Sequence, residues 1–158
     1  MIQSGDHNST RPKLTEEAGQ VALRDHVEAK AYDARLKHGP LIDADAMTAI
    51  LDDRSVVRYP VGIRFDAGPL APGEFAWPQQ LGDRPSAGYC LFLHPCFESQ
   101  PEIWPLLVAY HIPSINYGEI VTENEAELFG ATLLGMEVES YYQALCELSD
   151  AIQEGVPS

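Results

Sequence analysis

Residues 88–122, GYCLFLHPCFESQPEIWPLLVAYHIPSINYGEIVT, decide the fold of this chain and contain its main candidate site. The stretch has the most continuous apolar run in the sequence and two of the three cysteines. His94 and His111, both within it, are the two histidines of the chain that have apolar neighbours. Residues 88–93 are apolar at successive positions, which predicts a central strand that is covered on both faces and ends at His94.

Residues 105–112, PLLVAYHI, fit either a helix or a third strand, because their number and types suit both. Pro105 has no N–H to donate inside a helix that is already running, so a helix would begin there. We expect that helix to end before Pro113, and the strand stays open as the alternative.

Upstream of this stretch, residues 55–67 (SVVRYPVGIRFDA) alternate between apolar and polar side chains. This period of two predicts a half-buried strand, and Pro60 places it at a sheet edge or at a bulge. Residues 67–86 are rich in Gly and Pro, which predicts a long loop. Glu74, which precedes two aromatic residues in that loop, is interpreted as a solvated turn residue.

Helical patterns lie on both sides of these strands. The first predicted helix covers residues 15–38, with Val21, Tyr32 and Leu36 on its inner stripe, and it ends at a Gly-Pro pair. Asp43 is the expected N-cap of a short helix, and Thr122 with Glu125 forms a capping box that opens another. The predicted helices cover residues 15–38, 44–53, 105–112, 122–135 and 137–154.

These elements predict a disordered tail over residues 1–13 and one α+β domain over residues 14–158. Its small, mostly antiparallel sheet is expected to pack against a long N-terminal helix and a C-terminal helical pair. The odd number of cysteines argues against a disulfide framework. With no apolar segment of a signal peptide or of a membrane span, the sequence predicts a soluble cytoplasmic protein.

Charge is distributed unevenly along the chain. All ten Lys and Arg residues lie at or before Arg84, whereas residues 85–158 hold eleven acids and therefore carry −11 of the net charge of −14. A field of this sign repels phosphate groups, so we expect neither nucleic acid nor an anionic membrane as a partner. It attracts cations, basic proteins and cationic small molecules.

The segment His94-Pro95-Cys96-Phe97-Glu98 places three side chains that can bind metals at alternate positions. In an extended backbone these point the same way, so imidazole, thiolate and carboxylate can converge. Zinc or another divalent metal requires three or four such groups. The predicted metal ligands are His94, Cys96, His111 and Glu119. The sequence contains no HExxH motif, paired CxxC motif or EF-hand loop.

If the site is catalytic, a metal-activated water is the simplest mechanism, with Glu98 or Tyr117 as the general acid or base. Arg64 is the candidate to hold a carboxylate of a bound ligand. A second catalytic hypothesis is that Cys96 acts as a nucleophile with a neighbouring histidine as base.

The sequence thus predicts a small-molecule-binding or divalent-metal-binding domain with its site at the end of the central strand, and a hydrolase-like enzyme if it is catalytic. The alternative is a non-enzymatic acidic interaction protein that docks a basic partner or forms a homodimer. Tyr141 and Tyr142 are residue types that suit such an interface.

Overall fold

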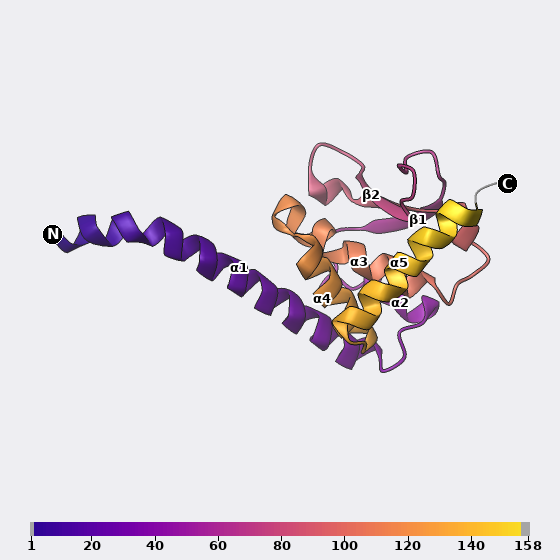
Figure 1. Cartoon of the computed structure of the whole chain (residues 1–158), viewed down its shortest axis with the longest axis horizontal. Coiled ribbons are helices and arrows are strands. Elements are labelled where there is room, and N and C mark those ends of the chain that lie inside the picture. The colour runs from indigo at the N-terminus through magenta and orange to yellow at the C-terminus, as the bar shows by residue number, and fades with distance from the viewer. Residues whose placement is uncertain (1, 156–158) are drawn as a thin grey trace.

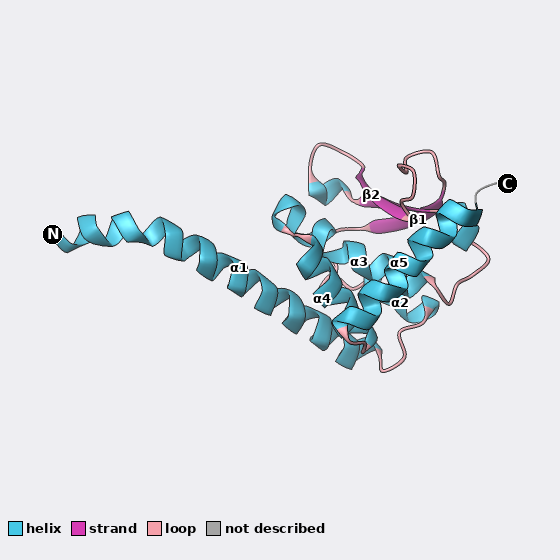
Figure 2. Ribbon diagram, viewed as in Figure 1, coloured by secondary structure: helices cyan, strands magenta, loops and turns pink. Residues whose placement is uncertain are grey.

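A computed structural model describes the backbone of residues 2–155 and the side chains of residues 16–152. The fold is α+β, with a long N-terminal helix and a C-terminal helical pair as predicted (Figures 1 and 2). Within residues 2–155, no helix is both long and apolar enough to cross a membrane. The elements are α1 (Ile2–His38), α2 (Ala44–Leu51), β1 (Val61–Phe65), β2 (Ala76–Gln80), β3 (Tyr89–Leu93), α3 (Trp104–Tyr117), α4 (Glu123–Leu134) and α5 (Val138–Gly155).

The sheet has the strand order β1-β3-β2, so β3 is central as predicted. It is a mixed sheet, since β3 pairs with β2 antiparallel and with β1 parallel. The helices gather on one side of it (Figure 2). Leu91 and Leu93 are fully buried in the main core, whereas Cys90 and Phe92, at alternate positions, are half-buried. The expected cover on both faces of β3 is therefore complete on one face only.

Strand β2 lies where the sequence predicted a loop. Its residues AWPQQ include Pro78, which pairs with Leu91 of β3. An edge strand tolerates proline because one side of its backbone does not need to donate hydrogen bonds. The abundance of Gly and Pro around β2 hid the strand from sequence reasoning, and pairing with the central strand stabilises it.

Helix α3 confirms the helical interpretation of residues 105–112, but it continues through Pro113 to Tyr117. Pro105 lies in its first turn, where a missing N–H costs nothing. An interior proline costs about 3 kcal/mol, and burial of most of this helix offsets that cost. Its buried residues face several directions, as expected of a helix in the centre of a domain: Pro105, Leu107, Val108, Ala109, Ile112, Pro113, Ile115 and Asn116.

Helix α1 begins at Ile2, earlier than the predicted position 15, and its N-terminal part extends away from the rest of the chain (Figure 1). The predicted inner stripe is wrong, because Val21, Tyr32 and Leu36 are 51%, 55% and 66% exposed. The buried residues of α1 include Ala31 and Ala34, and their small side chains allow close packing against α4.

The C-terminal end of α1 is held by a polar cluster around Asp53. The Asp53 carboxylate lies 2.7 Å from Lys37 Nζ and 2.9 Å from His38 Nε2. It also accepts a hydrogen bond from the Ser55 hydroxyl at 2.7 Å. The Lys37 ammonium, Ser55 and His38 together hold the pKa of Asp53 well below its usual range. This cluster fixes α1 to the segment that leads into β1.

Candidate ligand-binding site

A cavity of about 360 Å³ lies between the start of β2 and helices α3, α4 and α5. Its volume is near the lower end of the range for small-molecule sites, roughly 300–1,000 Å³. Segments that are far apart in the sequence meet here, so only the tertiary fold assembles the cavity. Its lining residues are Gly73, Glu74, Phe75, Ala76, Tyr110, His111, Glu123, Glu127, Tyr142, Leu145, Cys146, Ser149 and Asp150.

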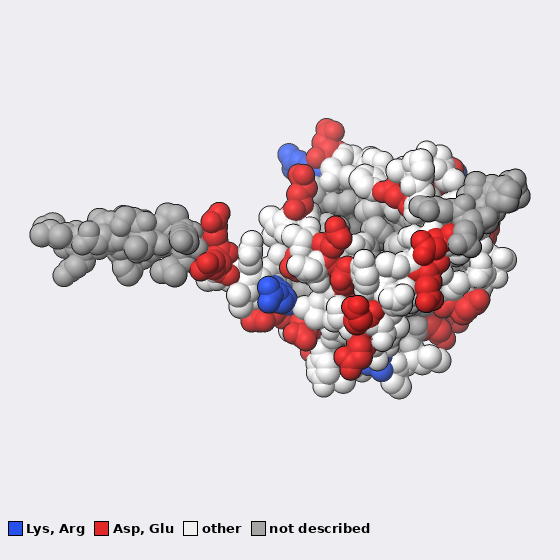
Figure 3. All heavy atoms as spheres, in the orientation of Figure 1, with Lys and Arg blue, Asp and Glu red and all other residues white. Residues whose placement is uncertain are grey.

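Four acids and no Lys or Arg lie in this lining: Glu74, Glu123, Glu127 and Asp150. Burial raises the pKa of Glu127, and the negative charges of Glu123 and Glu139 raise it further. A raised carboxyl pKa means that the surroundings of Glu127 do not fully stabilise the negative charge of the ionised carboxylate. One oxygen of Glu74 accepts a hydrogen bond from Ala71 N at 2.8 Å within the turn, and Glu74 as a whole is half-buried. Acids also outnumber bases on the face shown in Figure 3.

Aromatic rings form the apolar part of the wall. Phe75 and Tyr110 meet edge to face with centroids 6.2 Å apart, and Tyr110 meets His111 in the same way at 5.2 Å. Tyr142 contributes a third phenyl ring from α5. Burial, with the charges of Glu123 and Glu127, raises the pKa of Tyr110 to about 12. The Tyr110 hydroxyl is therefore neutral at physiological pH.

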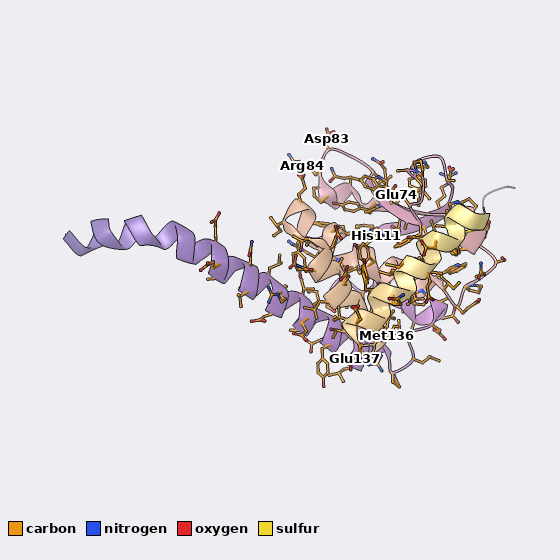
Figure 4. All side chains as sticks on the ribbon, in the orientation of Figure 1. Glu74, Asp83, Arg84, His111, Met136 and Glu137 are labelled. Atoms are coloured by element: carbon orange, nitrogen blue, oxygen red, sulfur yellow. The ribbon has the colours of Figure 1, made fainter. Side chains whose placement is uncertain are left out.

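His111 lines the cavity from α3 and is labelled in Figure 4 together with Glu74. Its Nε2 is buried and has no hydrogen-bond partner among the described residues. Burial lowers the pKa of His111 to about 4. The ring is therefore neutral at pH 7 and adds no positive charge to an acidic cavity. An unpaired buried nitrogen is unfavourable, and a ligand group or a water that pairs with it would remove that cost.

We expect the ring of His111 to remain neutral from pH 8 down to about pH 5, because its pKa is lowered to about 4 from the ordinary histidine value near 6.5. Histidine ring resonances followed by NMR across this range would test the prediction. The folded-state pKa lies below the unfolded value, so the unfolded chain binds the proton first. Stability linked to His111 is therefore complete above about pH 6.5 and declines as the pH falls toward 4. A midpoint for His111 near 6.5 would contradict the prediction.

The predicted ligands near the end of β3 lie outside this cavity. His94 Nδ1 accepts a hydrogen bond from Cys96 N at 3.1 Å, and His94 lines a different cavity beside Ala67 and Ile152. Cys96 and Glu98 are both exposed. Desolvation raises the pKa of the Cys96 thiol, opposite to the shift that activates a nucleophile.

The remaining predicted site residues are also dispersed. Tyr117 is the last residue of α3, roughly 9 Å beyond His111 along the helix axis. Its hydroxyl is buried without a partner among the described residues. Glu119 is exposed in the short turn after α3, and Arg64 is exposed on β1. His111 is thus the one predicted site residue that lines the acidic cavity.

No group of three or more His, Cys, Asp or Glu side chains is positioned to hold a metal ion in the part of the chain that the structure describes. The cavity residues that sequence reasoning missed are Tyr110, Glu123, Glu127 and Asp150, and Tyr142, which it assigned to an interface, also lines the cavity. The available signal was the spacing of four residues between Glu123 and Glu127, which puts both on one face of α4. On its own this spacing is typical of any solvated helix surface.

The comparisons with other proteins give no family assignment. No family model matches this chain, and the searches of curated proteins and of solved structures find no match either.

Proposed function

We propose that this protein binds a small organic cation, such as a polyamine or a quaternary ammonium compound, in the cavity between β2 and helices α3, α4 and α5. The observation that carries the proposal is the lining itself, which combines four carboxylates with the rings of Phe75, Tyr110 and Tyr142 and includes no Lys or Arg. Carboxylates neutralise an ammonium group, and aromatic faces attract it by about 0.5–2 kcal/mol each. The hydrocarbon part of such a ligand would lie on Phe75 and Leu145.

The electrostatics of the cavity support the same ligand class. The raised pKa of Glu127 reflects burial together with repulsion from Glu123 and Glu139. A bound cation would relieve that repulsion and favour the ionised carboxylate. An anionic ligand would meet the same charges unfavourably, and the neutral ring of His111 would not offset them.

Isothermal titration calorimetry with spermidine and with choline tests the proposal, and 1,4-butanediol serves as a neutral comparison. We expect both cations to bind and the diol not to bind. Glu127→Gln should weaken cation binding by roughly tenfold or more, since it removes one charge-assisted contact. Glu137→Gln is the matched control, because it changes net charge equally at an exposed acid that does not line the cavity.

Equal weakening by Glu127→Gln and Glu137→Gln would show that only the overall charge attracts the cation, and the proposal would fail. It would also fail if neither cation bound. Zinc belongs in the same titration, because the predicted metal set of His94, Cys96, His111 and Glu119 remains a proposal. Zinc binding that His94→Ala abolishes would favour that metal site over the cavity.

The docking of a basic protein, the alternative from the sequence, also remains a proposal. The excess of acids on the face shown in Figure 3 supports it. A charge-driven complex of this kind would weaken as salt is raised. We also propose a reducing, cytoplasmic location, which the three unpaired cysteines Cys90, Cys96 and Cys146 support.

A further inference from the structure

Strand β1 is an edge strand with one open side. It pairs only with β3 among the described strands. Tyr89 N donates to Pro60 O at 2.8 Å, and Asp66 N donates to Leu93 O at 3.1 Å, at the two ends of this parallel ladder. Even-numbered residues of β1 therefore direct their backbone groups to β3. The N–H and C=O groups of Val61, Ile63 and Phe65 point outward, where another strand can pair with them.

An apolar groove of about 280 Å³ runs beside this open edge. The side chains of Val61, Ile63 and Phe65 form one wall of it, and helices α2 and α3 form the others. The open edge thus combines outward backbone groups with an apolar surface, the two features that strand addition uses. The other residues of the groove are Ala44, Met47, Thr48, Leu51, Asp52, Trp104 and Val108.

We propose that a second copy of this chain pairs with β1 as an antiparallel strand, with the two-fold axis at Ile63. In this register Val61 lies opposite Phe65 of the partner subunit, and Ile63 lies opposite Ile63 of the partner subunit. Each of these pairs joins two outward-facing residues, which is what an antiparallel ladder requires. Side chains on opposite residues share one face of the sheet, so the partner's apolar residues lie on the groove side.

The polar face of β1 fits the same register. Gly62 lies opposite Arg64 of the partner subunit, and the position of a Cβ on Gly62 has no neighbouring atom within 4 Å. The partner's Arg64 side chain can therefore cross the bare backbone of Gly62. A register centred on Arg64 would instead place two arginines opposite each other, which is destabilising.

Charge favours this edge as the contact between two copies. The chain carries a net charge of −14, so most contacts between copies bring acids together. Strand β1, VGIRF, contains Arg64 and no acid. Asp52 lines the neighbouring groove and Asp66 follows the strand, but pairing along β1 places no acid of the strand itself opposite the partner, and a two-fold antiparallel contact closes the assembly at a dimer. The inference is independent of the cation site.

Sedimentation velocity of the full chain over a concentration series tests the proposal with three variants at one exposed position. Gly62→Glu should strengthen the dimer and Gly62→Arg should weaken it, because residue 62 faces Arg64 of the partner subunit. Two symmetry-related pairs change together, so we expect the dissociation constant to change by roughly three- to thirtyfold in each direction. Gly62→Ala, which adds only a Cβ, is the neutral control.

This order of affinities distinguishes dimerisation in the proposed register from association that is driven by net charge alone. In a chain of net charge −14, an added glutamate should weaken any nonspecific association and an added arginine should strengthen it. That reversed order would overturn the proposal, as would a monomer at every concentration up to about 1 mM. Circular dichroism confirms that each variant is folded. Hydrogen exchange supplies a second readout, and the amide of Ile63 should gain protection as the dimer forms.

Discussion

Replacing Asn116 with alanine is expected to lower the free energy of unfolding by about 3 kcal/mol. Asn116 is 3% exposed and joins the end of α3 to the segment before β1. Its Oδ1 accepts a hydrogen bond from Arg58 N at 2.8 Å, and its Nδ2 donates to Val56 O at 2.7 Å. Alanine would leave both backbone groups without partners, and each such loss costs about 1–3 kcal/mol where water cannot enter. Urea denaturation followed by circular dichroism measures the change.

Asn124→Ala is the matched control, because Asn124 is exposed at the start of α4. We expect that variant to change the unfolding free energy by less than about 0.5 kcal/mol. Asn116→Asp separates the two bonds, since the carboxylate can still accept from Arg58 N but has no N–H to donate to Val56 O. It should remain destabilised at pH 7, where a buried negative charge would face a carbonyl oxygen. A loss below about 1 kcal/mol for Asn116→Ala would show that water replaces the side chain.

Replacing Gly130 with alanine is expected to cost about 3 kcal/mol, although alanine favours helix more than glycine by about 1 kcal/mol. A Cβ at Gly130 would overlap the ring and hydroxyl of Tyr141. Tyr141 is fully buried and donates a hydrogen bond to Leu106 O at 2.7 Å, so its ring cannot move aside freely. The added methyl group would push α5 away from α4 or break that bond. Thermal and urea denaturation report the loss.

Gly19→Ala provides the control for helix propensity alone, since a Cβ at that helical glycine meets nothing within 4 Å. It should leave stability unchanged or raise it slightly. In a Tyr141→Ala background, Gly130→Ala should cost much less unfolding free energy, because the ring that the new Cβ would meet is absent. If Gly130→Ala alone left the unfolding free energy unchanged, the contact between Gly130 on α4 and Tyr141 on α5 would be less tight than the structure shows.

Local patterns in the sequence predicted those elements whose determinants lie close together in the chain. The capping box at the start of α4 is present, since Glu125 accepts from Thr122 N at 2.7 Å and Asn124 N donates to the Thr122 hydroxyl. Asp43 caps α2 by accepting from Ala46 N at 2.9 Å. These signals act within a few residues, so they do not depend on the rest of the fold.

Errors arose where a distant segment overrides a local preference. Strand β2 forms despite Pro78 because β3 supplies the hydrogen bonds of its ladder. Helix α3 continues past Pro113 because neighbouring elements bury most of it. The inner face of α1 was misjudged because an alanine-rich helix has several apolar stripes, and only its partner selects among them.

The candidate site shows the same division between local and distant determinants. The sequence singled out His111 through its apolar neighbours, and the fold buries it against Phe75 at the acidic cavity. Glu123 and Asp150 gave no such signal, because each lies on the polar face of its own helix. They share a cavity only because α4 and α5 both pack beside α3. A one-dimensional pattern records the direction of a side chain relative to its own element, not to another element.

The sequence by itself therefore determined the α+β class, the central strand, the helix caps and the acidic character of the chain. The tertiary structure alone decided which carboxylates and rings meet in one cavity and which strand edge remains open. The physical reason is the distance along the chain over which each determinant acts. Periodicity and capping act over a few residues, whereas a cavity or a sheet edge depends on contacts between segments that are tens of residues apart.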